Sequence, residues 1–303
     1  DGIRDSFVSR GLGDVYKTLS KAKAVIIRVI GGVPYWAYGL NQVKMIAEKK
    51  NIALAVLPAD GRDDQKLSSY SNIPNSTLKI INNLCNTGGA VASHAALSQI
   101  AITAGICSSI VSGEKYISKF GYWSPKRGIY KNIEKLEKNK KSIVLVVFYK
   151  SFITSCDLNP IKTLTAELQD NGLFVISCFL PSLKEPESSE WIKNVIIKTK
   201  PSAIVNATSF SSKGEDGFSP LDIGEVPVFQ ISLSTKKRSL WKKDDKGLSP
   251  TDMVLHVALP VIDGRLFDGI ASFKEKHKKN KFLEYTQIKH KADKERINSI
   301  VKK

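Results

Sequence analysis

Short, almost uninterrupted apolar runs that alternate with helix-like stretches constrain this sequence most. They read AVIIRVI at 24–30, IALAVL at 52–57, IVLVVFY at 143–149 and LFVISCF at 173–179. Strands this apolar are typical of parallel sheets, because crossover helices cover both faces of such a sheet. A segment with helical spacing of apolar residues follows each of these runs. The sequence therefore predicts βαβ units and an α/β fold.

The order of these units predicts the domain organisation. We expect two Rossmann-like layers with mostly parallel sheets, plus a C-terminal helix. The first α/β domain would occupy residues 1–112 and the second residues 142–265. Between them, residues 113–141 would form a basic connector that contains a helix from 129 to 139. Residues 266–303 would form a Lys-rich hinge and the C-terminal helix.

The stretch 226–273 holds the second half of the predicted site. Val228–Leu233 reads as a buried strand, and the apolar run Met253–Pro260 reads as another. The second run ends at Pro260 and is followed by Asp263-Gly264-Arg265. We expect these charged residues at a strand end, where α/β proteins bind their ligands.

The formal charge of +17 is concentrated in residues 114–141, 236–246 and 274–303, and the rest of the chain is neutral. Such clusters are typical of either a solvated Lys-rich surface or a surface for an acidic partner. The sequence contains no RRM, KH or zinc-finger pattern, so nucleic acid is not expected as a partner. A membrane is not expected either, because no apolar run approaches the ~20 residues that span a bilayer.

The sequence lacks the motifs for metal binding, nicotinamide binding and ATP hydrolysis. The four cysteines are scattered without CxxC spacing, and the histidines show no HxxxH or HxxE pattern, so no metal site is expected. Reduced thiols favour a cytoplasmic location. The sequence has neither GxGxxG nor GxxxxGK[ST], so we expect neither nicotinamide binding nor ATP hydrolysis by this chain.

Candidate binding residues near the N-terminus follow the first apolar run. Tyr35, Trp36 and Tyr38 would lie on the loop after Gly31-Gly32, where they could hold a flat ligand or pack the loop. Arg28 interrupts the apolar strand. A buried arginine needs a carboxylate, so Arg28 would pair with Asp60 or Asp63, or with a ligand.

Further candidates lie in the second half of the chain. Lys236 and Arg238 would bind carboxylates. His256 would be either a core histidine or a functional group beside the Asp-Gly-Arg tip. Asp263 would either tie the turn to Arg265 and to backbone amides, or take part in chemistry.

Two long stretches carry a family resemblance. One is WKKDDKGLSPTDMVLHVALPVIDGRL, residues 241–266, and the other is VIIRVIGGVPYWAYG, residues 25–39, followed by LAVLPADGRDD. With these stretches the chain resembles the large subunit of the aerobic cobaltochelatase. The large subunit of magnesium chelatase is a more distant relative. Because such subunits are far longer, this chain resembles a part from their N-terminal third.

The resemblance implies a function. The family inserts Co(II), as the substrate metal, into hydrogenobyrinic acid a,c-diamide in cobalamin biosynthesis, a ligase-type reaction. It works as a multisubunit complex in which an AAA+ ATPase partner handles ATP. The resemblance implies catalytic roles for Asp263 and His256. It implies binding of the corrinoid or other tetrapyrrole by Arg28, Tyr35, Trp36, Tyr38, Lys236, Arg238 and Arg265.

This sequence departs from the family at one position. The family carries a glutamate directly after the proline, where this chain has Val261. A carboxylate there could deliver the metal or take pyrrole protons, and valine cannot. Either Asp263 does this work, or residues outside this chain do. The alternative function is therefore a noncatalytic, two-domain binding or docking module, similar to a magnesium-chelatase subunit, that meets an ATPase partner. We expect the isolated chain to be inactive.

Overall fold

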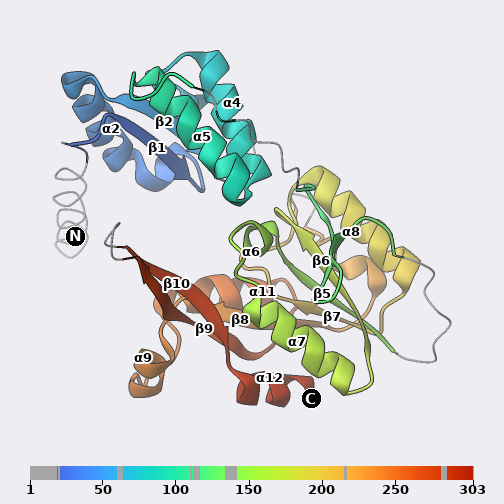
Figure 1. The fold of residues 1–303 in the computed structure, drawn as a ribbon. Coiled ribbons are helices and arrows are strands. Elements are labelled where there is room, and N and C mark those ends of the chain that lie inside the picture. Colours follow the sequence, from blue (N-terminus) through green and yellow to red (C-terminus); the bar gives the residue numbers. More distant parts are fainter. Residues whose placement is uncertain are drawn as a thin grey trace. The chain divides into compact units, whose positions relative to one another are not determined.

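The structure, a computed structural model, divides into two compact units, residues 1–117 and 118–303, and we describe each by itself. Figure 1 labels their elements. The residues that the structure describes are 19, 21–59, 64–109, 111, 117–133, 142–214, 217–280 and 285–302.

The first unit contains a βαβ motif. Strands β1 (Ala24–Val29) and β2 (Ala53–Pro58) pair in parallel, from Ala24 opposite Ala53 to Val29 opposite Pro58. Helix α2 (Val33–Lys50) connects them and ends where Asn51 adopts a left-handed conformation. The buried residues Leu40, Val43 and Ala47 recur at helical spacing and pack on the sheet.

Both faces of this small sheet are covered. Along β2, Leu54 and Val56 face the α2 cluster, whereas Ala55 and Leu57 belong to a second cluster. The second cluster is formed with helices α4 (Asn75–Thr87) and α5 (Gly89–Thr103), and a short helix α3 (Gln65–Ser68) precedes them. This layering is the reason that both strands are apolar at nearly every position.

The second unit has an eight-stranded sheet in the order β10-β9-β8-β7-β5-β6-β3-β4. Five strands are mutually parallel: β5 (Ile143–Tyr149), β6 (Phe174–Leu180), β7 (Ala203–Asn206), β8 (Val228–Ser234) and β9 (Leu266–Asn280). Three strands pair antiparallel with their neighbours: β3 (Gly121–Ser124), β4 (Gly128–Tyr130) and β10 (Tyr285–Ala292). Of these, β4 and β10 form the two edges of the sheet. The parallel part is a doubly wound sheet whose connections change direction between β5 and β7. The prediction of an α/β fold with mostly parallel sheets and a C-terminal helix is confirmed.

Helices cover both faces of this sheet. Helix α7 (Asn159–Asp170) contacts β6, β10 and the C-terminal helix α12 (Lys294–Val301), and the short α6 (Lys150–Thr154) precedes it. Helix α8 (Pro186–Thr199) packs Ile192, Val195 and Ile196 against the alternating residues of β5 and β6, and the short 3-10 turn η1 (Asp222–Gly224) contacts it. Figure 1 shows both layers of helices.

The segment 250–262 differs from its prediction. Met253–Pro260 is helical, so the prediction of a strand is wrong: α10 (Pro250–Met253), a π-helical turn η2 (Val254–Ala258) and α11 (Leu259–Ile262) follow one another. The Ser249 side chain accepts a hydrogen bond from Asp252 N and begins the helix, with proline at the first position. A short apolar run cannot by its periodicity distinguish a strand from a helix.

The side of this helix that faces the sheet meets polar residues. Gln230, Ser232 and Ser234 of β8 are fully buried, and Ser234 donates to Asp252. The opposite side of the helix exposes apolar residues, among them Val254 and Ile262.

Three further predictions of local structure are wrong. Residues 128–130 form β4 rather than the start of a helix, while residues 134–141 lie outside the described part. The Lys-rich stretch from Glu275 is the second half of β9, not a hinge, so the sheet continues beyond residue 265. Tyr35, Trp36 and Tyr38 lie in the first turns of α2 instead of a loop.

The edge of β10 is protected by side chains. His290 N donates to Asp157 Oδ1 at 3.0 Å, and Ala292 N donates to Asn159 Oδ1 at 2.8 Å. These acceptors occupy backbone donors that would otherwise be open to another strand. The His290 ring is buried against Phe152, and its Nδ1 lies 3.2 Å from Ser272 Oγ.

We predict that the second unit loses stability as the pH falls from about 6.5 to about 4. Burial lowers the pKa of His290 to about 4, with help from Lys274 and His256 and against the opposing effect of Asp157 and Asp252. The unfolded chain then binds a proton that the folded chain does not, so folding is favoured above the unfolded pKa and weakened below it. Between about pH 7 and about pH 5 the loss should be about 2 kcal/mol.

Urea unfolding followed by tryptophan fluorescence measures this loss, since Trp123, Trp191 and Trp241 lie in the second unit. The variant His290→Gln should flatten the pH dependence, and His277→Gln at an exposed position should not. An equally steep dependence in His290→Gln would contradict the assignment.

Candidate functional site

A pocket of about 620 Å³ lies at the carboxyl ends of the two strands of the first unit. Val29 and Pro58, the last residues of β1 and β2, line it together with the start of α2 and with Asp64, Lys66 and Leu67. Ligands of open α/β sheets bind at this position. The fold thus places a cavity beside the predicted residues of this unit.

The start of α2 borders the pocket. Gly31 and Gly32 adopt φ values of +87° and +76°, which L-residues rarely adopt, and they turn the chain sharply from β1 into the helix. No side chain caps this end of α2. Pro34 has no N–H and Tyr35 N donates to Gly32 O at 3.2 Å, so it is the helix dipole, more than a set of open backbone donors, that favours an anionic group here.

The three aromatic residues divide into two kinds. The side chain of Tyr35 is 78% exposed and that of Tyr38 is 59% exposed. Trp36 instead packs against the α2 cluster, and its ring lies over Gly39, where a Cβ atom would approach the ring within 1.9 Å. A local kink at Trp36, with φ of −147°, turns the ring inward. Tyr35 and Tyr38 are therefore open to a ligand, whereas Trp36 anchors the helix.

Arg28 is exposed on β1, not buried as its apolar surroundings in the sequence suggest. Its Nη2 donates to Asn86 Oδ1 at 3.1 Å. The carboxylates expected as partners, Asp60 and Asp63, lie outside the described residues.

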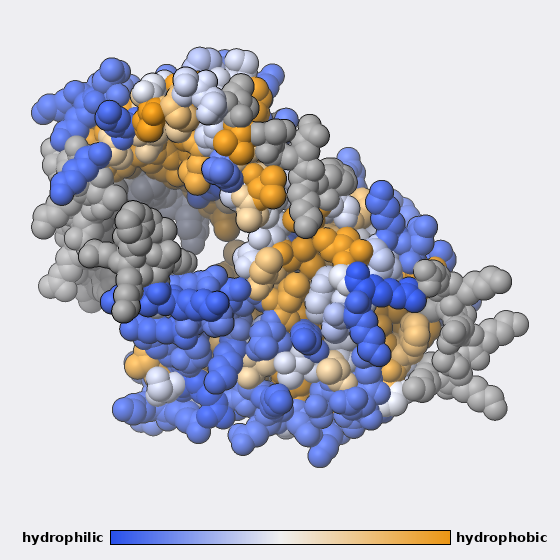
Figure 2. All heavy atoms as spheres, viewed as in Figure 1, coloured by the Kyte–Doolittle hydropathy of each residue, from blue (hydrophilic) through white to orange (hydrophobic). Residues whose placement is uncertain are grey.

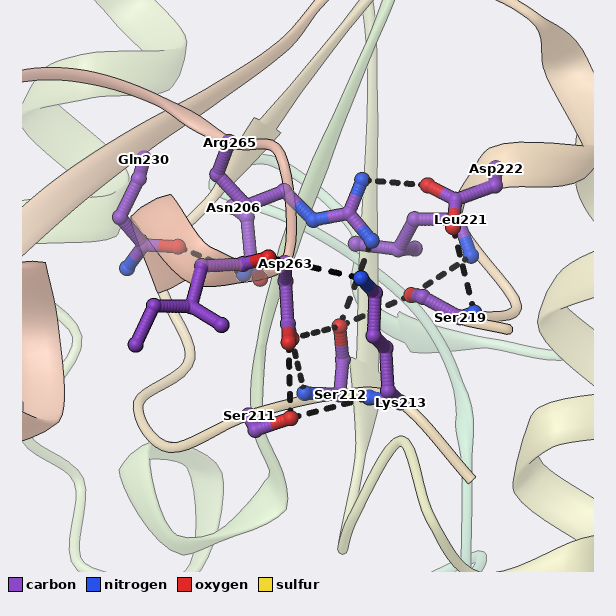
Figure 3. A network of polar contacts seen from close by, with 11 residues as sticks. Asn206, Ser211, Ser212, Lys213, Ser219, Leu221, Asp222, Gln230, Asp263 and Arg265 are labelled. Carbon is purple, nitrogen blue, oxygen red and sulfur yellow. Dashed lines mark hydrogen bonds and ion pairs between the residues drawn. The ribbon is translucent and has the colours of Figure 1, made fainter. Parts of the chain in front are cut away.

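Asp263 lies at the centre of a buried network in the second unit (Figure 3). Its carboxylate accepts hydrogen bonds from Ser211 Oγ at 2.8 Å, from Ser212 N at 2.5 Å and from Ser212 Oγ at 3.0 Å. The residue is 5% exposed. Such charge-assisted bonds fasten the end of α11 to the loop that follows β7.

Arg265 belongs to the same network and is equally buried. Its Nη1 donates to Asp222 Oδ1 at 2.6 Å, and its Nη2 lies 3.4 Å from Ser212 Oγ. Nε has no partner among the described residues. Since Asp263 and Arg265 are both engaged with protein groups, any chemistry with a substrate would require this network to open.

The remaining predicted residues surround the end of β8. Lys236 Nζ is bound to the Asp244 carboxylate and to Gly247 O, the latter at 3.0 Å. Arg238 Nε donates to Asp293 Oδ2 at 2.6 Å at the start of helix α9 (Arg238–Lys243). His256 lies in the π-helical turn, where burial lowers its pKa and its Nδ1 has no partner in the described part of the chain.

Sequence reasoning missed one residue at the point where the sheet changes direction. Lys150 directly follows β5 and is 8% exposed. Burial lowers the pKa of its ammonium group, and the nearby charge of Lys119 lowers it further. The available signal was a lysine directly after the apolar run IVLVVFY, because residues at this edge of a parallel sheet meet ligands.

Asp263→Asn should lower the free energy of unfolding of the second unit by about 2 to 3 kcal/mol. The Asp263 carboxylate accepts three hydrogen bonds, and in asparagine an NH₂ donor would replace one of its two acceptor oxygens. Chemical denaturation measures the change. Asp245→Asn, at an exposed position with the same change of charge, should leave stability within about 0.5 kcal/mol. Equal stabilities for the two variants would show that the network contributes little.

Within the part of the chain that the structure describes, neither a metal site nor a membrane-spanning helix is evident. Across the described residues, no cluster of three or more His, Cys, Asp or Glu side chains could hold a metal ion. No helix in that part of the chain has the length and hydropathy needed to cross a bilayer.

Comparison with known proteins finds two relatives of the same name. The aerobic cobaltochelatase subunit CobN of Sinorhizobium sp is 26% identical over 279 residues, which cover 86% of this chain and 21% of that protein. The subunit of the same name from Pseudomonas aeruginosa is 25% identical over 297 residues, or 94% of this chain and 23% of that protein. This chain therefore spans less than a quarter of the length of these relatives.

A solved structure supports the fold. The catalytic subunit of cobaltochelatase from Mycobacterium tuberculosis matches with a TM-score of 0.54 and 21% identity, over 94% of this chain and 23% of that chain. The family model described as CobN/Magnesium Chelatase matches residues 66–303, which is more than half of the sequence. The chain is therefore a member of the CobN/magnesium chelatase family.

Proposed function

We propose that this chain is part of the tetrapyrrole-binding large subunit of an ATP-dependent cobaltochelatase that inserts Co(II) into hydrogenobyrinic acid a,c-diamide in cobalamin biosynthesis. The observation that carries the proposal is the family match over residues 66–303. In this proposal Co(II) is a substrate, and the chain needs no resident metal site for it.

The reaction sets three requirements: a polycarboxylate macrocycle must be held, a dehydrated metal ion must reach its centre, and two inner protons must leave. The first requirement has the most support. The positive end of the α2 dipole borders the pocket and favours a carboxylate, and the exposed Tyr35 and Tyr38, in the first turns of the same helix, offer flat apolar faces. Arg28 points to the other face of β1 from Val29, toward Asn86 of α4, so it would bind a carboxylate on the α4 side of this sheet.

The second unit would supply further cations. Lys236 and Arg238 lie at the carboxyl end of β8, where a substrate carboxylate could compete with Asp244 or Asp293 for them. We assign proton transfer to Asp263 and His256. His256 remains neutral near pH 7 because burial lowers its pKa, so it could accept a proton. Arg265 would then hold the Asp263 turn in place and neutralise nearby charge.

ATP would act through a partner. The sequence has no phosphate-binding loop, so an AAA+ ATPase subunit would bind ATP and drive the large subunit in a multisubunit, ligase-type complex. All four cysteines are free thiols, which suits the reducing cytoplasm as the location.

A noncatalytic docking or binding module, similar to a part of a magnesium-chelatase subunit, is the second candidate. Two observations favour it: Asp263 and Arg265 are fully engaged inside the protein, and Val261 stands where the family carries glutamate. In that case the chain would meet the ATPase partner and leave the proton steps to residues elsewhere. Either way, turnover by the isolated chain is not expected.

Absorbance titration with a corrinoid precursor should show micromolar binding to this chain. The double variant Tyr35→Ala/Tyr38→Ala should bind about thirtyfold more weakly, because each ring contributes apolar contact worth roughly 1 kcal/mol. Both side chains are exposed, so the fold should remain intact. The matched control is Phe218→Ala, which removes an aromatic ring that is also exposed but belongs to the second unit.

Unchanged affinity in the double variant would remove the tyrosines from the site. If no spectral shift occurs but the chain is retained on the ATPase partner, the docking function is supported instead.

A further inference from the structure

Strands β9 and β10 form an arm that extends beyond the rest of the sheet. The pairing of β8 with β9 ends at Ser234 opposite Phe273, yet β9 continues to Asn280 and β10 returns from Tyr285. One backbone bond, from Lys274 N to Lys236 O at 3.1 Å, joins the base of the arm to the loop after β8. Residues 275–280 project past the carboxyl edge, as Figure 1 shows.

The arm is strongly basic. Residues 274–292 contain seven lysines, two glutamates and no arginine. Lys276, Lys278 and Lys279 are exposed, and none of them forms an ion pair with a described residue. Glu275 accepts a hydrogen bond from Arg238 N, and no ion pair among the described residues joins it to these lysines. The surface in this region is almost wholly hydrophilic in Figure 2.

The base of the arm is held firmly, although its outer part is free of the sheet. Phe273 packs on Trp241, whose other contact is the Arg296 guanidinium at 4.6 Å from the ring centre. On the other strand, Asp157 and Asn159 bind the backbone of β10. The lysines are therefore presented on a supported ribbon, with Lys276 and Lys278 on one face and Lys279 on the other.

We propose that this arm, through Lys276, Lys278 and Lys279, attracts the carboxylates of an incoming macrocyclic polycarboxylate and raises its rate of association. The inference rests on the proposed function. Clustered like charges produce a field that speeds the encounter with an opposite charge by about ten- to a thousandfold at low salt. Lysine suits this task, since its ammonium group is a hydrated point charge on a flexible stem and does not lock a carboxylate into a fixed bidentate geometry.

The position of the arm favours a macrocycle over nucleic acid as the occupant. Its base is bonded to Lys236, one of the residues assigned to substrate carboxylates, so a ligand attracted by the arm arrives beside that group.

Stopped-flow measurement of macrocycle binding to the whole chain tests the proposal. The probe is uroporphyrin, a flat macrocycle with acetate and propionate groups, and its fully methylated neutral ester is the comparison. The variant Lys276→Glu/Lys278→Glu/Lys279→Glu should lower the association rate about tenfold or more at low salt. The dissociation rate should change less, and the difference between variant and parent should vanish at high salt, where exposed charges are screened.

Two control variants distinguish the effect of the arm on the association rate from the effect of the net charge of the chain. Lys79→Glu/Lys162→Glu/Lys198→Glu makes the same change of charge at exposed helix positions, and its association rate should fall less than about threefold. Lys276→Arg/Lys278→Arg/Lys279→Arg keeps the charge and should keep the rate. The neutral ester should bind the parent and the glutamate variant equally fast.

The possible outcomes test the role of the arm separately from the proposed function. If the parent chain binds uroporphyrin and the arm variant associates at the same rate with the same salt dependence, the arm has no such role, while the proposed function stands. If the parent chain binds no macrocycle, both are overturned. If a short DNA duplex binds the parent more tightly than uroporphyrin and loses affinity in the arm variant, the arm is a nucleic-acid surface and the inference is wrong.

Discussion

The buried polar face of β8 is the constraint on which the C-terminal half of the second unit depends. Gln230, Ser232 and Ser234 have no exposure to solvent, so a polar atom without a partner within the protein costs free energy there. Ser232 Oγ has no partner among the described residues, whereas the other two side chains do. Gln230 is bound to Asn206 and to Thr208 O, and Ser234 to Asp252. These bonds position the loop after β7 and the helix at 250–262. Hydrogen bonds, more than apolar contacts, therefore decide which side of that helix faces the sheet.

The sequence was most informative where one local pattern decides the structure. The run Ile143–Tyr149 is a strand at the predicted residues, and the strand predicted at Val228–Leu233 is found at Val228–Ser234. Prediction from the sequence failed where the structure of a segment depends on residues that are distant in the chain. Met253–Pro260 is as apolar as a buried strand, but its inner side rests on a polar strand face that no local pattern reveals. The lysines after Glu275 looked like a hinge, yet pairing with β10 makes them a strand.

The candidate site, too, could be predicted from the sequence only in part. Its residue types could be selected from the sequence, because aromatic, basic and acidic residues follow apolar runs. Their surroundings could not, since Asp263 contacts Ser212 and Arg265 contacts Asp222 across more than forty residues of chain. The exposure of Tyr35 and the burial of Trp36 also depend on a kink in α2 that the sequence does not announce. The catalytic and binding roles given to these residues stay predictions.

The π-helical turn at Val254–Ala258 has a consequence for the two buried carboxylates beside it. An α-helix advances by about 100° per residue, so eleven residues return it to nearly the same direction. Asp252 and Asp263 would then point the same way. The wider turn changes that phase. Asp252 is aimed at Ser234 and Thr235, and Asp263 at Ser211 and Ser212. Because of this one irregular turn, the helix at 250–262 can hydrogen-bond two separate loops. Deleting one residue from the turn would remove the hydrogen bonds to one of these loops.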